Sequence, residues 1–311
     1  MRFAASLIVF APLLGCERVS PPPPAADTDP TPVAAAGLHN AFRVSPRIYS
    51  GSSPDDDAAF AALADLGIKT IITVDGSRPD VEAAHRHGLR YVHLPFGYDG
   101  IPHERVVALA KAAATLPGPI YVHCHHGQHR GPAAVAAIQL CTDPAWDTAR
   151  AAAWLKTAGT DPRYRGLIGL PQSLVRPTAE ELARAPADFP EVVAIPDLAR
   201  LMVDVDGHSD NLKLAKAAGW AVPKDHPDVD PPHEALQLVE AFREAARLDA
   251  VRKRGPEFGK LLADAEAAAG GLEAALRARP IDADRTAAAF ARSAATCAAC
   301  HDRFRDGPAG R

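Results

Sequence analysis

Residues 120–132 read IYVHCHHGQHRGP. A short β-type run from Ile120 to Cys124 is followed by a polar loop, and Pro132 then opens an Ala-rich stretch of helical character. The order predicts a strand, a loop and a helix N-terminus. Such a loop directs successive backbone N–H groups and the positive end of the helix dipole into one concavity, which suits a phosphate or a similar oxyanion.

Two side chains in this segment have matching chemistry. Cys124 stands at the start of the loop, where the field of the helix and the loop amides would stabilise a thiolate. Arg130 follows after five intervening residues, and its guanidinium could hold two phosphate oxygens at once. The pair therefore predicts a nucleophile and an anion clamp.

The pattern His-Cys-x5-Arg resembles the active-site loop of the cysteine-dependent protein tyrosine and dual-specificity phosphatases. The resemblance implies that Cys124 is the nucleophile and that Arg130 binds the phosphate. It implies a phosphate-binding loop made of His125, His126, Gly127, Gln128, His129 and Arg130. Upstream, strands rich in Ile and Val alternate with Ala-rich helices, which favours a mainly parallel sheet with flanking helices. We therefore expect an α/β phosphatase-like domain over residues 39–170.

Two positions qualify the resemblance. In the family a loop aspartate protonates the leaving oxygen, and Asp99 is the matching residue, although an Asp-Gly pair is also a turn signal. Gly131 follows the arginine, where the family usually has Ser or Thr to help the thiolate leave the phosphoenzyme. The sequence is thus consistent with a slow phosphatase or with a loop that only binds an oxyanion.

The loop is also unusually rich in histidine. His123, His125, His126 and His129 lie within seven positions. We expect a polar loop that happens to contain them, with a metal site as the alternative. The remaining cysteine of this half, Cys141, lies on the helical stretch after the loop and is expected to be a buried small apolar residue.

A second motif, C-A-A-C-H, occupies residues 297–301 inside a helical apolar pattern. Cys297 and Cys300 are spaced to bond the two vinyl groups of one porphyrin, and the imidazole of His301 reaches the iron from the same side. A disulfide and half of a zinc site are the alternatives. We expect one covalent haem c, with His301 as axial ligand of the iron.

Four amphipathic stretches make up the C-terminal part: residues 197–218, 232–248, 256–278 and 282–304. Their spacing predicts an all-α up-down four-helix bundle over residues 196–306, joined by a Pro-rich linker, residues 171–195. With Phe304-Arg305 after the motif, the last helix resembles cytochrome c′ and its six-coordinate cytochrome c556 relatives. The resemblance implies Met202 as the possible second axial ligand, with a core methionine, a ligand role for His208, or an open gas-binding site as alternatives.

The N-terminus has the pattern of an export signal. Arg2 precedes an apolar run that closes on Leu-Leu-Gly-Cys16, which resembles a bacterial lipobox. We expect a lipoprotein signal peptide at residues 1–16, lipidation of Cys16, and a Pro/Ala-rich tether at residues 17–38. These features predict a bacterial periplasmic or cell-envelope protein held at the membrane by its lipid anchor only.

The net charge of −4 and a pI near 6.3 argue against nucleic acid as a partner. Taken together, the motifs predict an exported, lipid-anchored c-type cytochrome fused to a cysteine-dependent phosphatase. The expected partners are a phosphorylated or other oxyanion substrate and an unknown redox partner. The alternative is an electron-transfer or sensor haem protein whose loop binds an oxyanion without catalysis.

Overall fold

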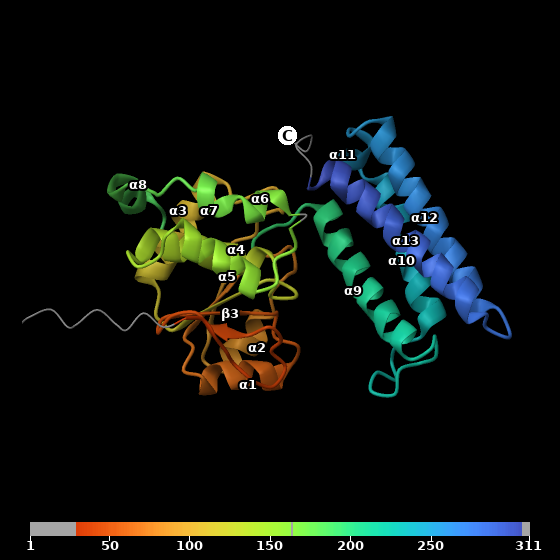
Figure 1. Ribbon diagram of the computed structural model, residues 1–311, viewed down its shortest axis with the longest axis horizontal. Helices are drawn as coiled ribbons and strands as arrows, with labels where there is room; N and C mark the ends of the chain where they lie inside the picture. Colours follow the sequence, from red (N-terminus) through yellow and green to blue (C-terminus); the bar gives the residue numbers. More distant parts are fainter. Residues whose placement is uncertain (1–28, 163, 307–311) are drawn as a thin grey trace, which may run out of the picture.

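The computed structural model describes residues 29–162 and 164–306. The predicted signal peptide, Cys16 and the first part of the predicted tether lie outside the described residues. The chain has an α/β part and an all-α part, which Figure 1 shows on either side of the segment that enters helix α9. Within the described ranges, no helix has the length and apolar character needed to span a membrane.

The α/β part is built on a six-stranded mixed sheet of order β1-β2-β3-β6-β4-β5. The four strands β3, β6, β4 and β5 run parallel, and the two short strands β1 and β2 extend one edge in antiparallel fashion. The strands are β1 (Thr31–Pro32), β2 (Phe42–Arg43), β3 (Ile48–Gly51), β4 (Thr70–Thr73), β5 (Arg90–His93) and β6 (Ile120–His123). Strand β6, which ends just before Cys124, therefore lies inside the sheet, between β3 and β4.

Helices cover both faces of this sheet, and successive side chains of its strands point alternately into the two cores that the helices form with it. Ile120 and Val122 belong to the core shared with α3, α4 and α5, whereas Tyr121 belongs to the core shared with α1 and α2. The helices are α1 (Asp57–Asp65), α2 (Val81–Arg86), α3 (His103–Thr115), α4 (Arg130–Thr142), α5 (Thr148–Thr157), α6 (Arg165–Ile168) and α7 (Leu170–Ser173). The α/β class expected from the sequence is confirmed, with an antiparallel extension that the sequence did not indicate.

Part of the expected tether is folded. Thr31–Pro32 pairs with Phe42–Arg43, and Leu38 is buried in the core under α1. Residues 31–38 therefore pack with the α/β part, ahead of the start expected at residue 39. The Pro/Ala-rich composition concealed this because a two-residue edge strand has almost no sequence signal.

The expected linker is also packed onto the α/β part. Helix α8 (Ala179–Arg184) lies against α3, where Glu181 pairs with His103 at 2.8 Å and Leu182 O accepts from Lys111 Nζ at 2.8 Å. Phe189 is buried in the core of the sheet. This segment therefore covers the α/β part before the chain turns to α9.

The all-α part has four long helices, whose ends lie within one residue of those expected. They are α9 (Asp197–Ala217), α10 (Pro231–Arg247), α12 (Pro256–Arg277) and α13 (Ala283–Phe304), with the short α11 (Asp249–Arg252) between α10 and α12. Helix α9 packs on α10, α10 on α12, and α12 on α13. Their apolar stripes form a core that is separate from those of the sheet. Helix α9 is the long helix nearest to the α/β part (Figure 1).

Candidate functional site

The loop between β6 and α4 is held open by hydrogen bonds to its carbonyl groups. Three loop carbonyls accept from other segments: His125 O from Ser53 N–H (3.0 Å), Gly127 O from the Asn40 amide (2.9 Å) and Gln128 O from the Thr160 hydroxyl (2.7 Å). In a trans peptide the C=O and the following N–H point to opposite sides. Because these carbonyls turn outward, the N–H groups that follow them turn toward the interior of the loop, an arrangement of the kind that suits an anion.

Gly127 is required by this arrangement. Its φ is +69°, and a Cβ at this position would lie 2.3 Å from the carbonyl carbon of Gly51. The loop therefore packs directly on the backbone at the end of β3. Only glycine combines the left-handed conformation with so close an approach.

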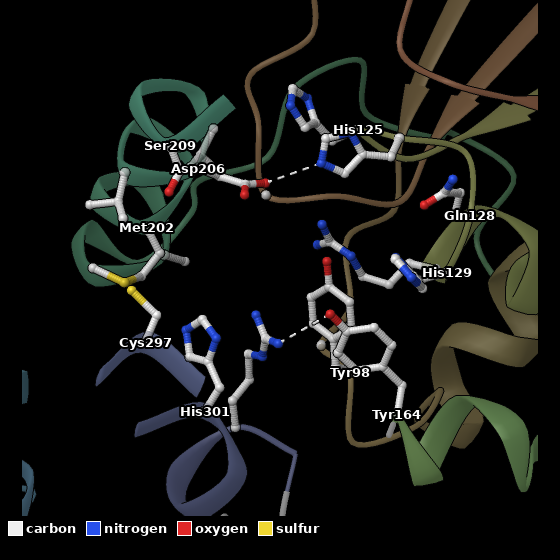
Figure 2. Close-up of a pocket in the computed structure, with 18 of the residues that line it drawn as sticks. Tyr98, His125, Gln128, His129, Tyr164, Met202, Asp206, Ser209, Cys297 and His301 are labelled. Atoms are coloured by element: carbon white, nitrogen blue, oxygen red, sulfur yellow. Dashed lines mark hydrogen bonds and ion pairs between the residues drawn. The ribbon is translucent and has the colours of Figure 1, made fainter. Parts of the chain in front are cut away.

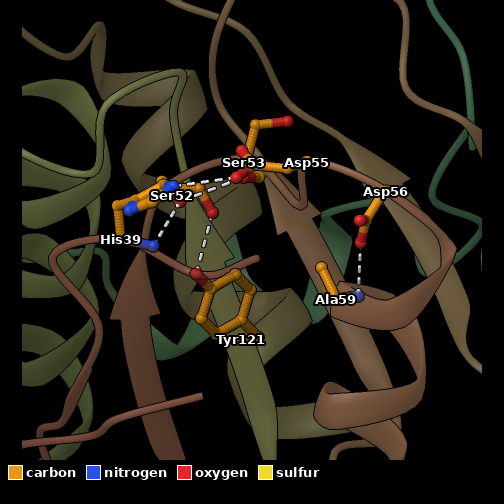
Figure 3. Close-up of polar contacts among 7 residues, drawn as sticks. All are labelled: His39, Ser52, Ser53, Asp55, Asp56, Ala59 and Tyr121. Atoms are coloured by element: carbon orange, nitrogen blue, oxygen red, sulfur yellow. Dashed lines mark hydrogen bonds and ion pairs between the residues drawn. The ribbon is translucent and has the colours of Figure 1, made fainter. Parts of the chain in front are cut away.

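The segment that holds the loop is itself fixed from two sides, as Figure 3 shows. Tyr121 on β6 donates its hydroxyl to Ser52 O at 2.8 Å, and the Ser52 hydroxyl accepts from His39 N–H at 2.8 Å. The His39 imidazole pairs with Asp55 at 2.8 Å. These hydrogen bonds hold the segment that contains Ser53, and they therefore fix the position of the N–H that donates to the loop.

His123, the last residue of β6, is part of the support and not of the anion surface. It is buried, and its Nε2 pairs with the Tyr91 hydroxyl at 2.7 Å. Burial lowers the pKa of His123 to about 4, so the imidazole is neutral at pH 7. It fixes the strand end from which Cys124 enters the loop.

A cavity of about 2180 Å³ separates the loop from the all-α part. His125, His126, Gln128, His129 and Arg130 line one side of it. The other side is lined by side chains of α9, α12 and α13, including Met202, Cys297, Cys300 and His301. The two predicted sites, which lie far apart in the sequence, therefore face the same space (Figure 2). Cys124 lies at the base of the loop and is only 3% exposed.

The residues predicted to hold haem are directed into this cavity from α13. Burial raises the pKa of both thiols, Cys297 and Cys300. Burial also lowers the pKa of His301 to about 4, which leaves its imidazole neutral, the form that binds metals. Met202 enters the same cavity from α9 (Figure 2). His208 instead pairs with Glu234 at 2.7 Å and is not among the residues that line the cavity.

Tyr98 connects the two sides, although the sequence had not pointed to it. The guanidinium of Arg130 lies 4.5 Å from the centre of its ring, and that of Arg305 lies 4.3 Å from it. Arg305 also contacts the Tyr164 hydroxyl at 3.4 Å (Figure 2). Burial raises the pKa of Tyr98 to about 12, so the phenol keeps its proton at physiological pH. Cation–π contacts therefore join the loop arginine, through Tyr98, to the residue that follows helix α13.

Asp99 lies outside this cavity. It lines a separate hollow with Gly100 and Gly166, and its Oδ1 is 2.8 Å from the position of a Cβ on Gly97. Of the two neighbours on this loop, Tyr98 is therefore the one that faces Arg130. The general-acid role of Asp99 remains a prediction.

Gly131 fits closely where it stands. A Cβ here would lie 3.1 Å from the backbone nitrogen of Cys124, so a serine would force the base of the loop to shift by a few tenths of an ångström. The family's Ser or Thr hydroxyl is therefore absent at a position where α4 packs tightly against the end of β6. Farther along α4, Cys141 is half-buried and unpaired, and burial raises its pKa to about 11.

Comparison with known proteins gives a likeness for the α/β part. No protein-family model matches the chain. The chain is 28% identical over 171 residues to the dual specificity protein phosphatase TpbA of Pseudomonas aeruginosa strain UCBPP-PA14, covering 52% of this chain and 72% of that protein. The same protein from strain PAO1 is 28% identical over 149 residues, with 45% and 66% covered. The N-terminal half resembles the TpbA-like phosphatases.

Solved structures cover the same half. The crystal structure of P. aeruginosa TpbA is 20% identical, covering 48% of this chain and 92% of that one at a TM-score of 0.43. The catalytic core of the PP-IP phosphatase Siw14 from S. cerevisiae is 18% identical, covering 40% and 79% at a TM-score of 0.36.

The contact between Gly127 and Gly51 leads to a test of the loop. We expect Gly127→Ala to weaken binding of orthovanadate by at least about tenfold, since local strain of about 1–3 kcal/mol must be relieved by moving the loop. Gly67→Ala is the matched control, because Gly67 also has a positive φ (+79°) but nothing within 4 Å of its Cβ position. Equal affinities of the two variants, measured by calorimetry, would show that the close approach does not shape the anion site.

Proposed function

We propose that the chain is an exported, lipid-anchored protein in which a cysteine-dependent phosphatase domain is fused to a four-helix c-type cytochrome of the cytochrome c′/c556 kind. The supporting observation is the single cavity that His125, His126, Gln128, His129 and Arg130 of the loop line together with Cys297, Cys300 and His301. The lipobox-like Leu-Leu-Gly-Cys16 supports a location in the bacterial periplasm or cell envelope. The similarity to a dual specificity phosphatase supports a phosphate monoester as the substrate.

The phosphatase reaction runs through Cys124. Its thiolate attacks phosphorus and forms an S–P bond while the bond to the ester oxygen breaks. Arg130 and the inward N–H groups hold the phosphoryl oxygens as charge develops on them. The leaving oxygen takes a proton from Asp99, whose side chain would have to turn into the cavity from the neighbouring hollow. A water then attacks the phosphocysteine and gives its proton to the same carboxylate, while the S–P bond breaks and releases phosphate and the Cys124 thiolate.

The residues on the other side of the cavity suit a haem. Two thiols and a neutral imidazole converge on it, together with apolar side chains such as Phe258, Leu262 and Phe304. Its volume of about 2180 Å³ exceeds the ~300–1,000 Å³ of an ordinary small-molecule pocket, which leaves room for a porphyrin beside a substrate. Cys297 and Cys300 would bind the haem and His301 its iron, with Met202 as the candidate for a second iron ligand. When bound, the haem supplies electron transfer or binding of a small ligand.

A non-catalytic oxyanion-binding loop on an electron-transfer or sensor haem protein is the second candidate. The close packing around Gly131 favours it, because a hydroxyl that would assist release of the thiolate is missing there. The two functions differ in one result. Haem-loaded protein under reducing conditions hydrolyses aryl phosphates in the first case, and only binds orthovanadate in the second.

Substitution of the nucleophile tests the enzymatic proposal. We expect Cys124→Ser to abolish release of phosphate from p-nitrophenyl phosphate while Cys141→Ser leaves the rate unchanged, because Cys141 lies away from the loop. We expect Asp99→Asn to slow hydrolysis of esters with poor leaving groups far more than esters with good ones. Activity that survives in Cys124→Ser would contradict the mechanism, and a uniform effect of Asp99→Asn would remove its acid role.

The haem proposal is tested without reference to activity. Protein expressed with haem-maturation factors should show one covalent haem by intact mass, and Cys297→Ser/Cys300→Ser should show none. Met202→Leu should keep the adduct but change the ferric visible spectrum from low-spin to high-spin, because the thioether ligand is lost. An unchanged spectrum would exclude Met202 as ligand, and wild type without an adduct would refute the cytochrome assignment.

A further inference from the structure

Two loop histidines face away from the interior of the loop, toward α9. His125 and His126 meet Asp206 and Asp210, which stand one helical turn apart on that helix (Figure 2). The separations from imidazole Nε2 to carboxylate Oδ2 are 3.5 Å for His125–Asp210, 3.6 Å for His126–Asp210 and 3.8 Å for His126–Asp206. The cluster therefore joins the two parts of the chain across the rim of the cavity.

These separations differ from those of other histidine–carboxylate pairs. The other five such ion pairs among the described residues lie at 2.7–3.1 Å, the range of a direct hydrogen bond. One ligand atom each from His125, His126 and Asp206 lies within 4.8 Å of the others. Donor atoms that surround one ion tetrahedrally at about 2.0–2.1 Å are about 3.3–3.4 Å apart. The three separations of 3.5–3.8 Å are therefore closer to the spacing of donors around a shared ion than the separations of the direct pairs are.

Charge and orientation agree with this geometry. Lys213 binds Oδ1 of Asp210 at 2.6 Å, which leaves Oδ2 directed at the two imidazoles. A carboxylate held by a neighbouring donor in this way is typical of the outer contacts that orient metal ligands. The two imidazoles and two carboxylates come from a loop fixed by hydrogen bonds and from a helix, so their positions are set by the fold. All four residues line the cavity and are open to solvent.

We propose that His125, His126 and Asp206 bind one divalent transition-metal ion, with zinc as the expected occupant and Asp210 as the fourth donor beside it. Imidazole and carboxylate ligands at these distances suit zinc. The ion would fasten α9 to the phosphate-binding loop. Neither the phosphocysteine chemistry nor the haem requires it, so it adds a second metal to the protein.

Zinc content and affinity test the proposal on tag-free, haem-loaded protein, in which haem occupies Cys297, Cys300 and His301. After dialysis against chelator, calorimetry with zinc chloride should give one site per chain with a micromolar or tighter Kd. We expect His126→Ala and Asp206→Asn each to weaken binding at least tenfold, although they lie in different parts of the chain. Zinc-edge X-ray absorption should show nitrogen and oxygen ligands at about 2.0–2.1 Å.

The controls are matched in residue type and exposure. His103→Ala removes an imidazole that is 42% exposed, compared with 41% for His126, and Asp264→Asn removes a carboxylate that is 45% exposed, compared with 49% for Asp206. Both controls should bind zinc as wild type does. Far-UV circular dichroism verifies that each variant is folded.

Three results would overturn the metal site. Wild type that binds no stoichiometric zinc leaves the cluster as a set of long ion pairs. Equal loss of affinity in the controls shows that the four residues are not specific ligands. Sulfur scatterers at about 2.3 Å place the zinc on cysteines. None of these readouts depends on phosphatase turnover, so failure here is distinct from failure of the proposed enzymatic function.

Discussion

The rest of the site depends on three hydrogen bonds that hold loop carbonyls pointing outward from the loop. Ser53, Asn40 and Thr160 come from three different segments, and each donates to a carbonyl of the loop. Without them the peptide planes would be free to turn, and the N–H groups would not converge beside Cys124. The buried Tyr121 and His123 then set the position of the strand end, and Gly127 allows the loop to rest on the backbone of β3. In the proposed function, this backbone geometry and the guanidinium of Arg130 would together supply the positive charge that holds an oxyanion.

The same loop faces the second part of the chain. Tyr98 lies between the guanidinium groups of Arg130 and Arg305, and Arg305 directly follows the helix that contains the C-x-x-C-H motif. A change around His301 therefore has a short physical route to Arg130, the proposed phosphate ligand. Two cations on one ring, next to a cavity, also create a field that favours anions in that space. The proposed haem and the proposed substrate would share this field.

The sequence predicted the helices and strands whose residue patterns lie within the element itself. The four long helices and the strand-loop-helix around Cys124 follow from apolar spacing and from Pro132, and both were expected at their observed places. It could not predict that residues 31–38 join the α/β part or that helix α8 packs against α3, because a two-residue strand and a six-residue helix carry too little periodicity to indicate their packing partners. Tyr98 and Asp206 were missed for a different reason: each owes its role to neighbours that are distant in the chain. The sequence showed that the loop is rich in histidine. It could not show that His125 and His126 lie near two carboxylates of α9, the other proposed metal ligands.

Paramagnetic relaxation of bound phosphate would show whether the loop after Cys124 and the C-x-x-C-H residues face one cavity. Phosphate held by haem-loaded Cys124→Ser protein would be observed by ³¹P NMR in the ferric state and in the diamagnetic ferrous carbonyl state. A shared cavity predicts strongly enhanced ³¹P relaxation in the ferric protein that disappears in the carbonyl form. Equal relaxation in the two states, with phosphate shown to be bound in both, would contradict it.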